Sequence, residues 1–421
     1  MTTTARLLPT DGRPRSLGEH RASYPVPPRS SRRASPELIA SINASGLSGR
    51  GGASFPTGRK LAAVANGNGV PVVVVNACES EPASAKDKTL LRFVPHLVLD
   101  GAMAAAAAVG ADRVVVVVER DTPRSTTSLR HAIGERAIEG GLRIEVIEVP
   151  PRFVSGEESA VVHHLNGGES KPTTTPPRPF ERGVDGRPTL VSNVETFAHM
   201  AQILRFGPDW FREYGTVSEP GTMLVTLSGA VTSPGVYEVA MGTPLPQVVH
   251  AAGGATHGVS AVLVGGYYGT WVAESDAVEA RLCNESLQRL GARVGCGSLI
   301  VFPVGDCGLG ATAQILTWLA GETAQQCGPC MHGLPALANA ANALAVGAYD
   351  ATPQRLLLRW SSQIEGRGGC RMPDGAVRLL RSALSVFADD VILHSNGRSC
   401  GAPSGESLLE LPPHRPNRDW R

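Results

Sequence analysis

Residues 71–77, PVVVVNA, form a run of apolar β-branched residues that ends in polar ones. A short apolar run with such boundaries predicts a strand buried inside a sheet. Apolar runs at 112–121 and 142–150 predict two further strands, and residues 96–111 and 125–141 predict the helices that alternate with them. Strands that alternate with helices indicate an α/β fold with a parallel, Rossmann-like sheet.

The rest of the chain changes pattern twice. Short strands with Gly/Pro turns and a single helix predict a small α+β module of the β-grasp type, and the helical spacing of later apolar residues predicts a helical bundle. An N-cap pattern at Ser35-Pro36 is expected to mark the start of ordered structure. The expected division is an irregular N-terminal arm at 1–36, an α/β domain at 37–218, a β-grasp domain at 219–303, a helical domain at 304–400 and a loose tail at 401–421.

Composition excludes several classes of protein. The chain has 421 residues, which favours two to three domains. Its formal net charge of +1 gives no electrostatic case for binding nucleic acid or an anionic membrane. The sequence shows neither a long apolar run nor a secretory signal, so we expect a cytoplasmic protein without a membrane span. In a reducing cytosol its eight cysteines indicate metal binding, catalysis or burial rather than disulfides.

A glycine-rich loop is the most informative stretch for ligand binding. Residues 46–60, GLSGRGGASFPTGRK, bring many backbone N–H groups and a lysine together, an arrangement suited to an anion such as phosphate. The acidic segments 76–88 and 153–160, and the polar segment 191–197, follow predicted strands, where ligands of open α/β sheets bind. Taken singly, each segment is equally compatible with a flexible or solvated turn, so their combination carries the prediction.

Together the four segments resemble one family, the flavin-binding, NADH-oxidising subunit of bacterial and mitochondrial complex I, which is shared with NAD-linked hydrogenases and formate dehydrogenases. The chain looks like a divergent paralogue of this subunit. Residues 227–245 are similar to the β-grasp ligand-binding (SLBB) module of that family, and the helical region corresponds to its iron–sulfur domain. The matching segments are 49–60, 76–82, 155–160 and 192–196.

The resemblance implies that the first domain binds FMN and that NADH stacks over the flavin ring. Glu81 and Glu158 would flank the nicotinamide as the catalytic pair. The cofactor-binding residues implied by the family pattern are Gly49, Gly51, Gly52, Lys60, Asn76, Cys78, Glu79, Ser80, Phe153, Gly156, Glu157, Glu158, Val191, Ser192, Asn193 and Thr196.

Several positions depart from the family pattern. Cys78 replaces an aspartate of the flavin site, and Ser54 and Ser192 replace a glycine and an asparagine. The family's aromatic and lysine contacts to the dinucleotide are retained only at Phe55. The other positions carry Ala63, Thr175 and Arg178. FMN binding is therefore better supported than NADH use.

The tetrapeptide 327–330, CGPC, has two interpretations. It is the active-site sequence of thioredoxin-like enzymes, but those need a preceding strand, and residues 312–326 predict a helix. The complex I family has a cysteine cluster here instead. By that resemblance Cys327, Cys330 and Cys370 are metal ligands, and the first cysteine of the family set is Ala324.

Three outcomes remain open for this cluster. A [4Fe–4S] cluster is completed by a substitute such as Cys400, His332 or an external group, a three-cysteine [3Fe–4S] centre forms, or the cluster is lost and only thiols remain. The other cysteines, among them Cys307, are expected to be core or incidental residues.

The combined interpretation is an NADH dehydrogenase-type flavoprotein. A hydride would pass from NADH to FMN, and single electrons would then pass through the cluster to a ferredoxin-like protein or a sister iron–sulfur subunit. Its expected location is the cytoplasm, compatible with a place at the periphery of a membrane complex. Two alternatives stay open: a flavin and iron–sulfur relay between proteins that has lost NADH use, and a non-enzymatic scaffold.

Overall fold

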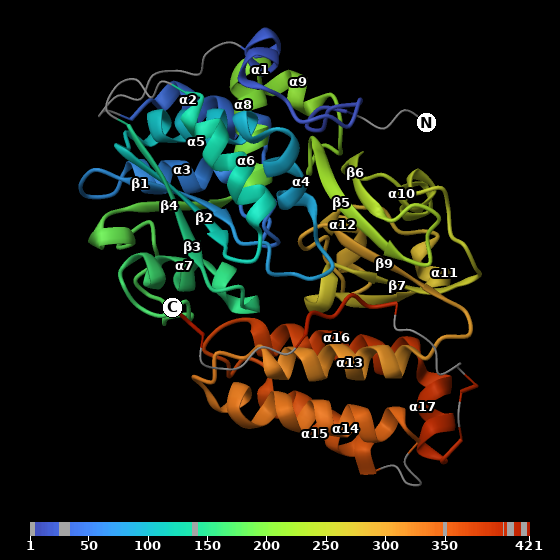
Figure 1. Ribbon diagram of the computed structural model, residues 1–421. Helices are drawn as coiled ribbons and strands as arrows, with labels where there is room; N and C mark the ends of the chain where they lie inside the picture. Colours follow the sequence, from blue (N-terminus) through green and yellow to red (C-terminus); the bar gives the residue numbers. More distant parts are fainter. Residues whose placement is uncertain are drawn as a thin grey trace.

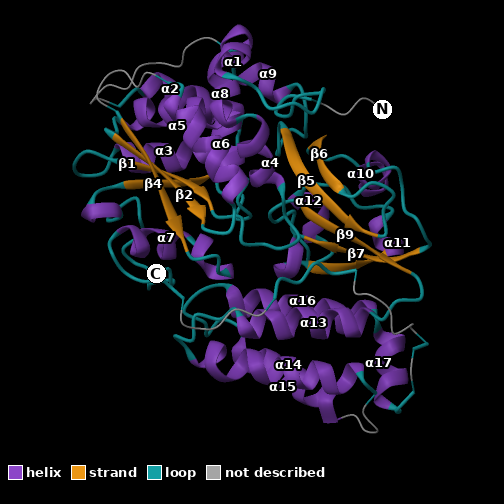
Figure 2. Ribbon diagram, viewed as in Figure 1, coloured by secondary structure: helices purple, strands orange, loops and turns teal. Residues whose placement is uncertain are grey.

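The computed structural model describes residues 5–24, 34–136, 142–347, 352–398, 400–401, 408–413 and 419–421. Two sheets and a helical region make up the structure (Figure 1). The two sheets lie side by side and the helical region lies below both of them, as the colouring by secondary structure makes clear (Figure 2). This arrangement agrees with the three-part fold class expected from the sequence.

The first sheet is parallel throughout and has the order β3-β2-β1-β4. Its strands alternate with helices, as predicted. One face carries Val73 and Val75 into a core shared with α5 and α8, and the other carries Val72 and Val74 against α7. Burial on both faces explains the unbroken valine runs. The elements are β1 (Val72–Ala77), β2 (Arg113–Glu119), β3 (Arg143–Val149), β4 (Thr189–Asn193), α2 (Pro36–Ser45), α3 (Thr57–Ala65), α4 (Lys86–Phe93), α5 (Pro95–Val109), α6 (Pro123–Gly134), α7 (Glu158–Leu165), α8 (Val194–Phe206) and α9 (Pro208–Arg212).

Helices α5 and α8 pack closely because α5 consists largely of small residues. A Cβ atom at Gly101 of α5 would lie 1.8 Å from the carbonyl oxygen of Phe197 on α8, so only glycine fits there. Among the described residues, no single helix combines the length and apolar character of a membrane span, and α4 and α5 meet those criteria only jointly, as a pair bent by 98°.

The second sheet has the order β6-β5-β9-β7-β8. Strands β5 and β9 are parallel, and the remaining pairs are antiparallel. Strand β8 was not expected from the sequence, since it has only four residues. The elements are β5 (Thr222–Gly229), β6 (Gly235–Ala240), β7 (Val259–Val264), β8 (Thr270–Ala273), β9 (Ser298–Pro303), α10 (Leu245–Ala251), α11 (Glu274–Ala277), α12 (Asn284–Gln288) and the short helix η3 (Gly266–Tyr268).

The C-terminal region is helical, as predicted, with a core of leucine and alanine side chains. Helix α13 ends earlier than expected, at Gly321, and Gln325 has a left-handed backbone (φ 54°). Cys327 therefore follows a non-helical segment and not a helix. The elements are α13 (Gly308–Gly321), the π-helical turn η4 (Pro329–Gly333), α14 (Leu334–Ala345), α15 (Thr352–Ile364), α16 (Met372–Val386) and α17 (Ala388–Ser395).

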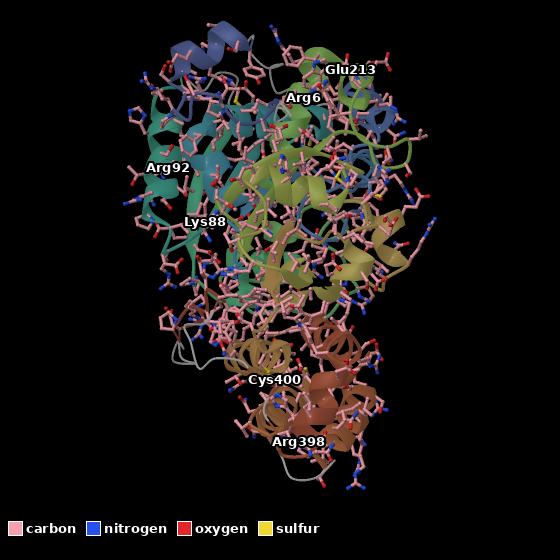
Figure 3. All side chains as sticks on the ribbon, turned by 90° about the vertical axis from the view of Figure 1, so that its right-hand side faces the viewer. Arg6, Lys88, Arg92, Glu213, Arg398 and Cys400 are labelled. Carbon is pink, nitrogen blue, oxygen red and sulfur yellow. The ribbon has the colours of Figure 1, made fainter. Side chains whose placement is uncertain are left out.

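The expectation of an irregular N-terminal arm is wrong for its described part. Residues Leu17–Ser23 form helix α1, which begins with a capping box. His20 of this helix is buried and lies 2.6 Å from Asp100 of α5. Ahead of the helix, Arg6 pairs with Glu213 at 2.7 Å and stacks on Trp210 (Figure 3). Ordered structure thus begins well before Ser35.

The arm also contacts the second sheet. The backbone N–H groups of Arg6 and Leu7 donate to Glu238 of β6 at 2.8 and 2.7 Å, and Thr222 donates to the same carboxyl group. Burial of Glu238 raises its pKa from 4.5 to about 7. One side chain therefore connects the arm to the β-grasp domain.

The Glu238→Gln substitution should change the pH dependence of stability. The folded chain keeps a proton on Glu238 up to about pH 7, whereas an unfolded glutamate releases it near 4.5. The wild-type protein should therefore lose stability as pH rises through this window, and the variant should gain relative to it. Thermal unfolding midpoints measured between about pH 5 and about pH 8 test this. Glu213→Gln, an exposed partner of Arg6, is the control, and parallel midpoints for Glu238→Gln and wild type would contradict the expectation.

The tail is not loose where it is described. Leu409 and Trp420 are buried, and the backbone N–H of Ser170 donates to the Trp420 carbonyl at 2.7 Å. The Trp420 ring lies under the guanidinium of Arg152, which brings the C-terminus beside α7 (Figure 1).

Candidate functional site

Four loops meet at the carboxyl edge of the parallel sheet. Asn76, near the end of β1, donates from its side chain to the carbonyl of Gly156 at 2.7 Å. A Cβ atom at Gly156 would lie 2.9 Å from the Cys78 carbonyl, and one at Gly51 would lie 3.2 Å from Cβ of Asn193. The structure thus brings together segments that lie far apart in the sequence: Asn76 and Gly156 are separated by 80 residues.

The glycine loop is held to α8 through its backbone. The N–H of Arg50 donates to Thr196 Oγ1 at 2.9 Å, and the N–H of Gly49 donates to the Phe55 carbonyl. Gly52 has φ 107°, a backbone conformation that favours glycine. The Arg50 guanidinium is buried and donates to the carbonyls of Pro220 and Thr222, so this arginine joins two domains.

Gly156→Ala should weaken flavin binding without unfolding the protein. The added methyl group forces the loop of Cys78 away from the loop of Gly156, and overpacking of this kind costs about 1–3 kcal/mol. If that strain falls on the ligand-binding arrangement, the flavin dissociation constant rises roughly 5- to 150-fold. Fluorescence titration of FMN into flavin-depleted protein measures the change. The matched control is Gly134→Ala on α6, where a Cβ meets nothing within 4 Å, and equal affinities for both variants would refute the role of Gly156.

The lysine and one glutamate of the predicted site form an ion pair. Lys60 Nζ of α3 lies 3.0 Å from Oε1 of Glu158, the first residue of α7. Glu157 instead caps α7 and accepts from the backbone N–H groups of Ser159 and Ala160 at 2.9 and 3.2 Å. The adjacent glutamates therefore have different surroundings: one pairs with a cation and the other is fixed by a helix terminus.

Two other glutamates of the predicted site are anchored. Glu79 accepts from the Ser84 hydroxyl and from the N–H groups of Asp87 and Lys88 in the first turn of α4. Glu81 accepts from the N–H of Tyr267 at 2.9 Å, across the boundary with the second sheet. Burial raises the pKa of Glu81 to about 7.

Sequence reasoning missed a buried charge network beneath these loops. Lys86 lies 2.8 Å from Asp87, 2.9 Å from Glu195 and 3.0 Å from the side-chain oxygen of Asn193. Burial acts to raise the pKa of Glu195, but Lys86, His199 and Arg50 together outweigh it and lower that pKa to about 2. Asn193 also caps α8, so its side chain connects the network to the predicted flavin site. The only signal in the sequence was a lysine and an aspartate within an acidic segment.

The remaining predicted residues lie on or beside the same edge. Val191 and Ser192 belong to β4, where Ser192 is paired with Val75 of β1. Cys78 donates from its thiol toward the Val117 carbonyl at 3.7 Å, and burial raises its pKa. Ser80 and Phe153 line a cavity of about 120 Å³, whose other lining residues are Glu79, Pro82, Lys88, Glu119, Asp121, Thr122, Pro151, Arg152, Trp318, Glu322 and Pro412.

An aromatic cluster joins this edge to the helical region. The ring of Phe153 lies 4.4 Å from that of Tyr268 and 5.2 Å from that of Trp318. Beside it, Arg152 Nη1 lies 3.4 Å from Glu322, which also accepts from the N–H of Phe153 at 3.1 Å. The loop after β3 is therefore fixed directly to the segment that leads to Cys327.

The three cysteines of the predicted cluster lie near the Tyr268 ring of this aromatic cluster. Cys327 and Cys370 both act on the pKa of the Cys330 thiol, and Cys327 acts on that of Cys370, so the three thiols lie near one another. Burial raises the pKa values of the Cys330 and Cys370 thiols, and Glu157 also acts on Cys370. Their sulfur atoms do not all lie within 4.8 Å of one another, unlike those of a group around a single ion. This wider spacing suits thiolates that bind different iron atoms of one cluster.

The position of the missing ligand lies in the apolar core, where Ala324 is 5% exposed. The suggestion that Cys400 replaces the missing ligand is wrong. Its sulfur lies near Cys307, which caps the N-terminus of α13, whereas Ala324 lies beyond the C-terminus of that 14-residue helix. At 1.5 Å per residue the helix separates them by about 21 Å. His332 is an exposed residue of η4.

The residues at the sheet edge fit a flavin phosphate. The hydroxyls of Thr57 and Ser155 are buried, and among the described residues neither has a hydrogen-bond partner. Gly51 and Gly156 leave room that a side chain would fill, and Lys60 supplies a cation. The cysteine group fits an iron–sulfur cluster through its three thiols, although it lacks a fourth.

Comparisons with known proteins agree with this geometry. A profile described as Nuo51 FMN-binding domain matches residues 42–202, an SLBB domain matches 224–266, and the NADH-ubiquinone oxidoreductase-F iron-sulfur binding region matches 310–394.

Similar proteins cover most of the chain. An F-type subunit of the NADH-quinone oxidoreductase of Rhizobium meliloti is 31% identical over 379 residues, which are 86% of this chain and 90% of that relative. The F-type subunit of the Streptomyces coelicolor oxidoreductase is 32% identical over 86% of this chain and 84% of the relative. A crystal structure of an NAD+-reducing [NiFe]-hydrogenase in the air-oxidised state matches with a TM-score of 0.82 and 27% identity. The match covers 90% of this chain, which spans 65% of that hydrogenase chain.

Proposed function

The chain belongs to the family of F-type subunits of NADH-quinone oxidoreductase, and from this premise we propose that it transfers electrons from NADH through FMN and an iron–sulfur cluster to a protein partner. FMN, when bound, accepts a hydride and releases electrons singly, and the protein supplies its placement and electrostatics. The observation that carries the proposal is the junction between the two sites. Phe153 and Glu157 lie in the same loop as Gly156 of the flavin site, and Phe153 packs on Tyr268 while Glu157 interacts electrostatically with Cys370.

Each part of the site has a role in this proposal. The glycine loop, Thr57 and Lys60 bind the flavin phosphate, while Asn76 and Gly156 fix the loops beside the ring. Glu81 and Glu158 flank the nicotinamide. Their environments differ, since Glu81 is anchored on Tyr267 with a raised pKa and Glu158 is paired with Lys60.

The aromatic side chains pack between the two sites. Phe153 and Trp318 pack edge to face, as do Phe153 and Tyr268. Burial raises the pKa of Tyr268, and the next largest influence is Cys370, so this tyrosine stays neutral beside the thiols. The partner that accepts electrons is a ferredoxin-like protein or a sister iron–sulfur subunit, since the family members are named as subunits.

The test is anaerobic purification with flavin and iron analysis, followed by NADH titration monitored by optical and EPR spectra. Bleaching of the flavin and reduction of the cluster by NADH are the expected results. Protein that contains neither flavin nor iron would point to a scaffold and overturn the proposal.

A relay that does not use NADH is the second candidate. The substituted dinucleotide positions, Thr175 and Arg178, favour it. Both residues are exposed, and the backbone N–H of Arg178 donates to the Glu181 carboxylate. In this case dithionite, but not NADH, would reduce the flavin.

A further inference from the structure

A second group of metal-ligand atoms lies outside the site described above. The ligand atoms of Cys307, His394 and Cys400 all lie within 4.8 Å of one another, and among the described residues this is the only such group of three. Sγ of Cys307 is 3.8 Å from Nε2 of His394. Figure 3 places Cys400 in the helical region, and in the sequence it follows the last residue of α17, Ser395, by five residues. The separations suit a single ion.

The histidine is oriented as a metal ligand. Its Nδ1 lies 3.1 Å from the carbonyl oxygen of Leu344, and a carbonyl can only accept, so Nδ1 carries the proton. The lone pair of Nε2 then faces Cys307. Metal-bound histidines usually donate their second N–H to a carbonyl or carboxylate in this way. His394 is 4% exposed, so the orientation is fixed inside the core.

The first cysteine lies at a helix N-terminus, which stabilises negative charge on its sulfur, whereas burial raises the pKa of the free thiol. Cys307 caps α13, and its sulfur accepts from the N–H of Gly310 at 3.3 Å. The positive end of a helix dipole stabilises a thiolate at this position. On the other side, Asp390 lies one turn before His394 on α17 and interacts electrostatically with both Cys307 and His394.

We propose that Cys307, His394 and Cys400 bind one Zn²⁺ ion. Two thiolates and one imidazole are the ligand types of protein zinc sites, which are tetrahedral. The fourth position belongs to a water molecule or to the nearby Asp390 carboxylate. The site is structural: it fastens residue 400 and α17 to the start of α13, where the chain leaves β9. It lies at the other end of α13 from Cys327 and is independent of the flavin and the iron.

The test measures zinc, iron and flavin together in the full-length protein purified without added metal. We expect one zinc per chain in the wild type and its loss in Cys307→Ser and Cys400→Ser, with iron and flavin unchanged. Removal of a ligand should weaken zinc binding by more than about 100-fold, because even the loss of a partner outside the ligand sphere costs 10–100-fold. The matched control is Cys283→Ser, a buried cysteine that belongs to neither group.

A spectroscopic measurement separates a true site from adventitious zinc. Co²⁺ added to chelator-treated protein should give thiolate charge-transfer and tetrahedral ligand-field bands in the wild type and in Cys283→Ser, and these should vanish in Cys400→Ser. Cys370→Ala should lose iron and keep these bands. Wild-type protein without zinc that takes up no Co²⁺ after reduction would overturn the proposal, and so would a Cys307–Cys400 disulfide that persists with no metal uptake.

Discussion

Replacing Cys370 by alanine is expected to remove the iron of the protein while leaving its flavin in place. Three thiols are available for the cluster, and Ala324 already takes the place of a fourth. With only two cysteines left, iron should fall to less than roughly a tenth of the wild-type content, since clusters are held by their thiolate ligands. NADH should still bleach the flavin, but electrons should no longer reach a protein acceptor. Iron analysis, EPR spectra and acceptor reduction measure these effects.

Two matched variants give this experiment its controls. Cys283→Ala removes a buried cysteine that precedes α12, a helix packed in the core of the second sheet, and it should keep iron at the wild-type content. Ala324→Cys should supply the missing thiol, raise iron content and change the EPR spectrum. Wild-type iron in Cys370→Ala would show that this cysteine is not a ligand.

Replacing Lys86 by methionine should be among the most destabilising single changes in the α/β domain. Lys86 is 1% exposed, and its ammonium group forms ion pairs with both Asp87 and Glu195 in the core. Removing one partner of a buried ion pair leaves an uncompensated charge and costs about 3–5 kcal/mol. Urea denaturation monitored by far-UV circular dichroism measures the loss. Flavin content should also fall, because Asn193 accepts a hydrogen bond from Lys86.

The pH dependence distinguishes a charge effect from a packing effect. Without Lys86, protonation of the two carboxyl groups relieves their repulsion, so the deficit should shrink as pH falls. Burial already raises the pKa of Asp87 to about 6 in the presence of Lys86, and loss of the cation raises it further. Lys88→Met on the same helix is the control, since its side chain is 37% exposed and should cost less than about 1 kcal/mol. A small or pH-independent loss in Lys86→Met would contradict a role for charge.

Patterns within short segments predicted the elements but not their ends. The valine runs at β1 and β2 are strands because both faces of the sheet are covered. The alternation of strands and helices correctly predicted the parallel sheet. Helix α13 stops at Gly321, although helix-forming residues continue, because Glu322 turns inward to Arg152 and Phe153. Helix propensity depends on the local sequence and therefore does not predict that contact.

The two ends of the chain also show that local sequence patterns do not predict contacts with distant residues. Residues 5–24 look irregular in sequence because they have little periodicity of their own. Their partners, Glu238 and Asp100, are supplied by other parts of the chain. Trp420 likewise acquires its place from Arg152 and Ser170.

The sequence by itself determined the α/β fold and predicted the four loops of the flavin site and the three cluster cysteines, because each depends on residues close together or on a spaced motif. Only the tertiary structure decided which glutamates are helix caps, that Lys86 pairs with two buried carboxylates, and that Cys400 meets Cys307 and His394 and not the cluster. These features join residues from separate elements, and a side chain's role there is set by the neighbours that folding brings to it. Local patterns report which face of an element is buried, but not what it is buried against.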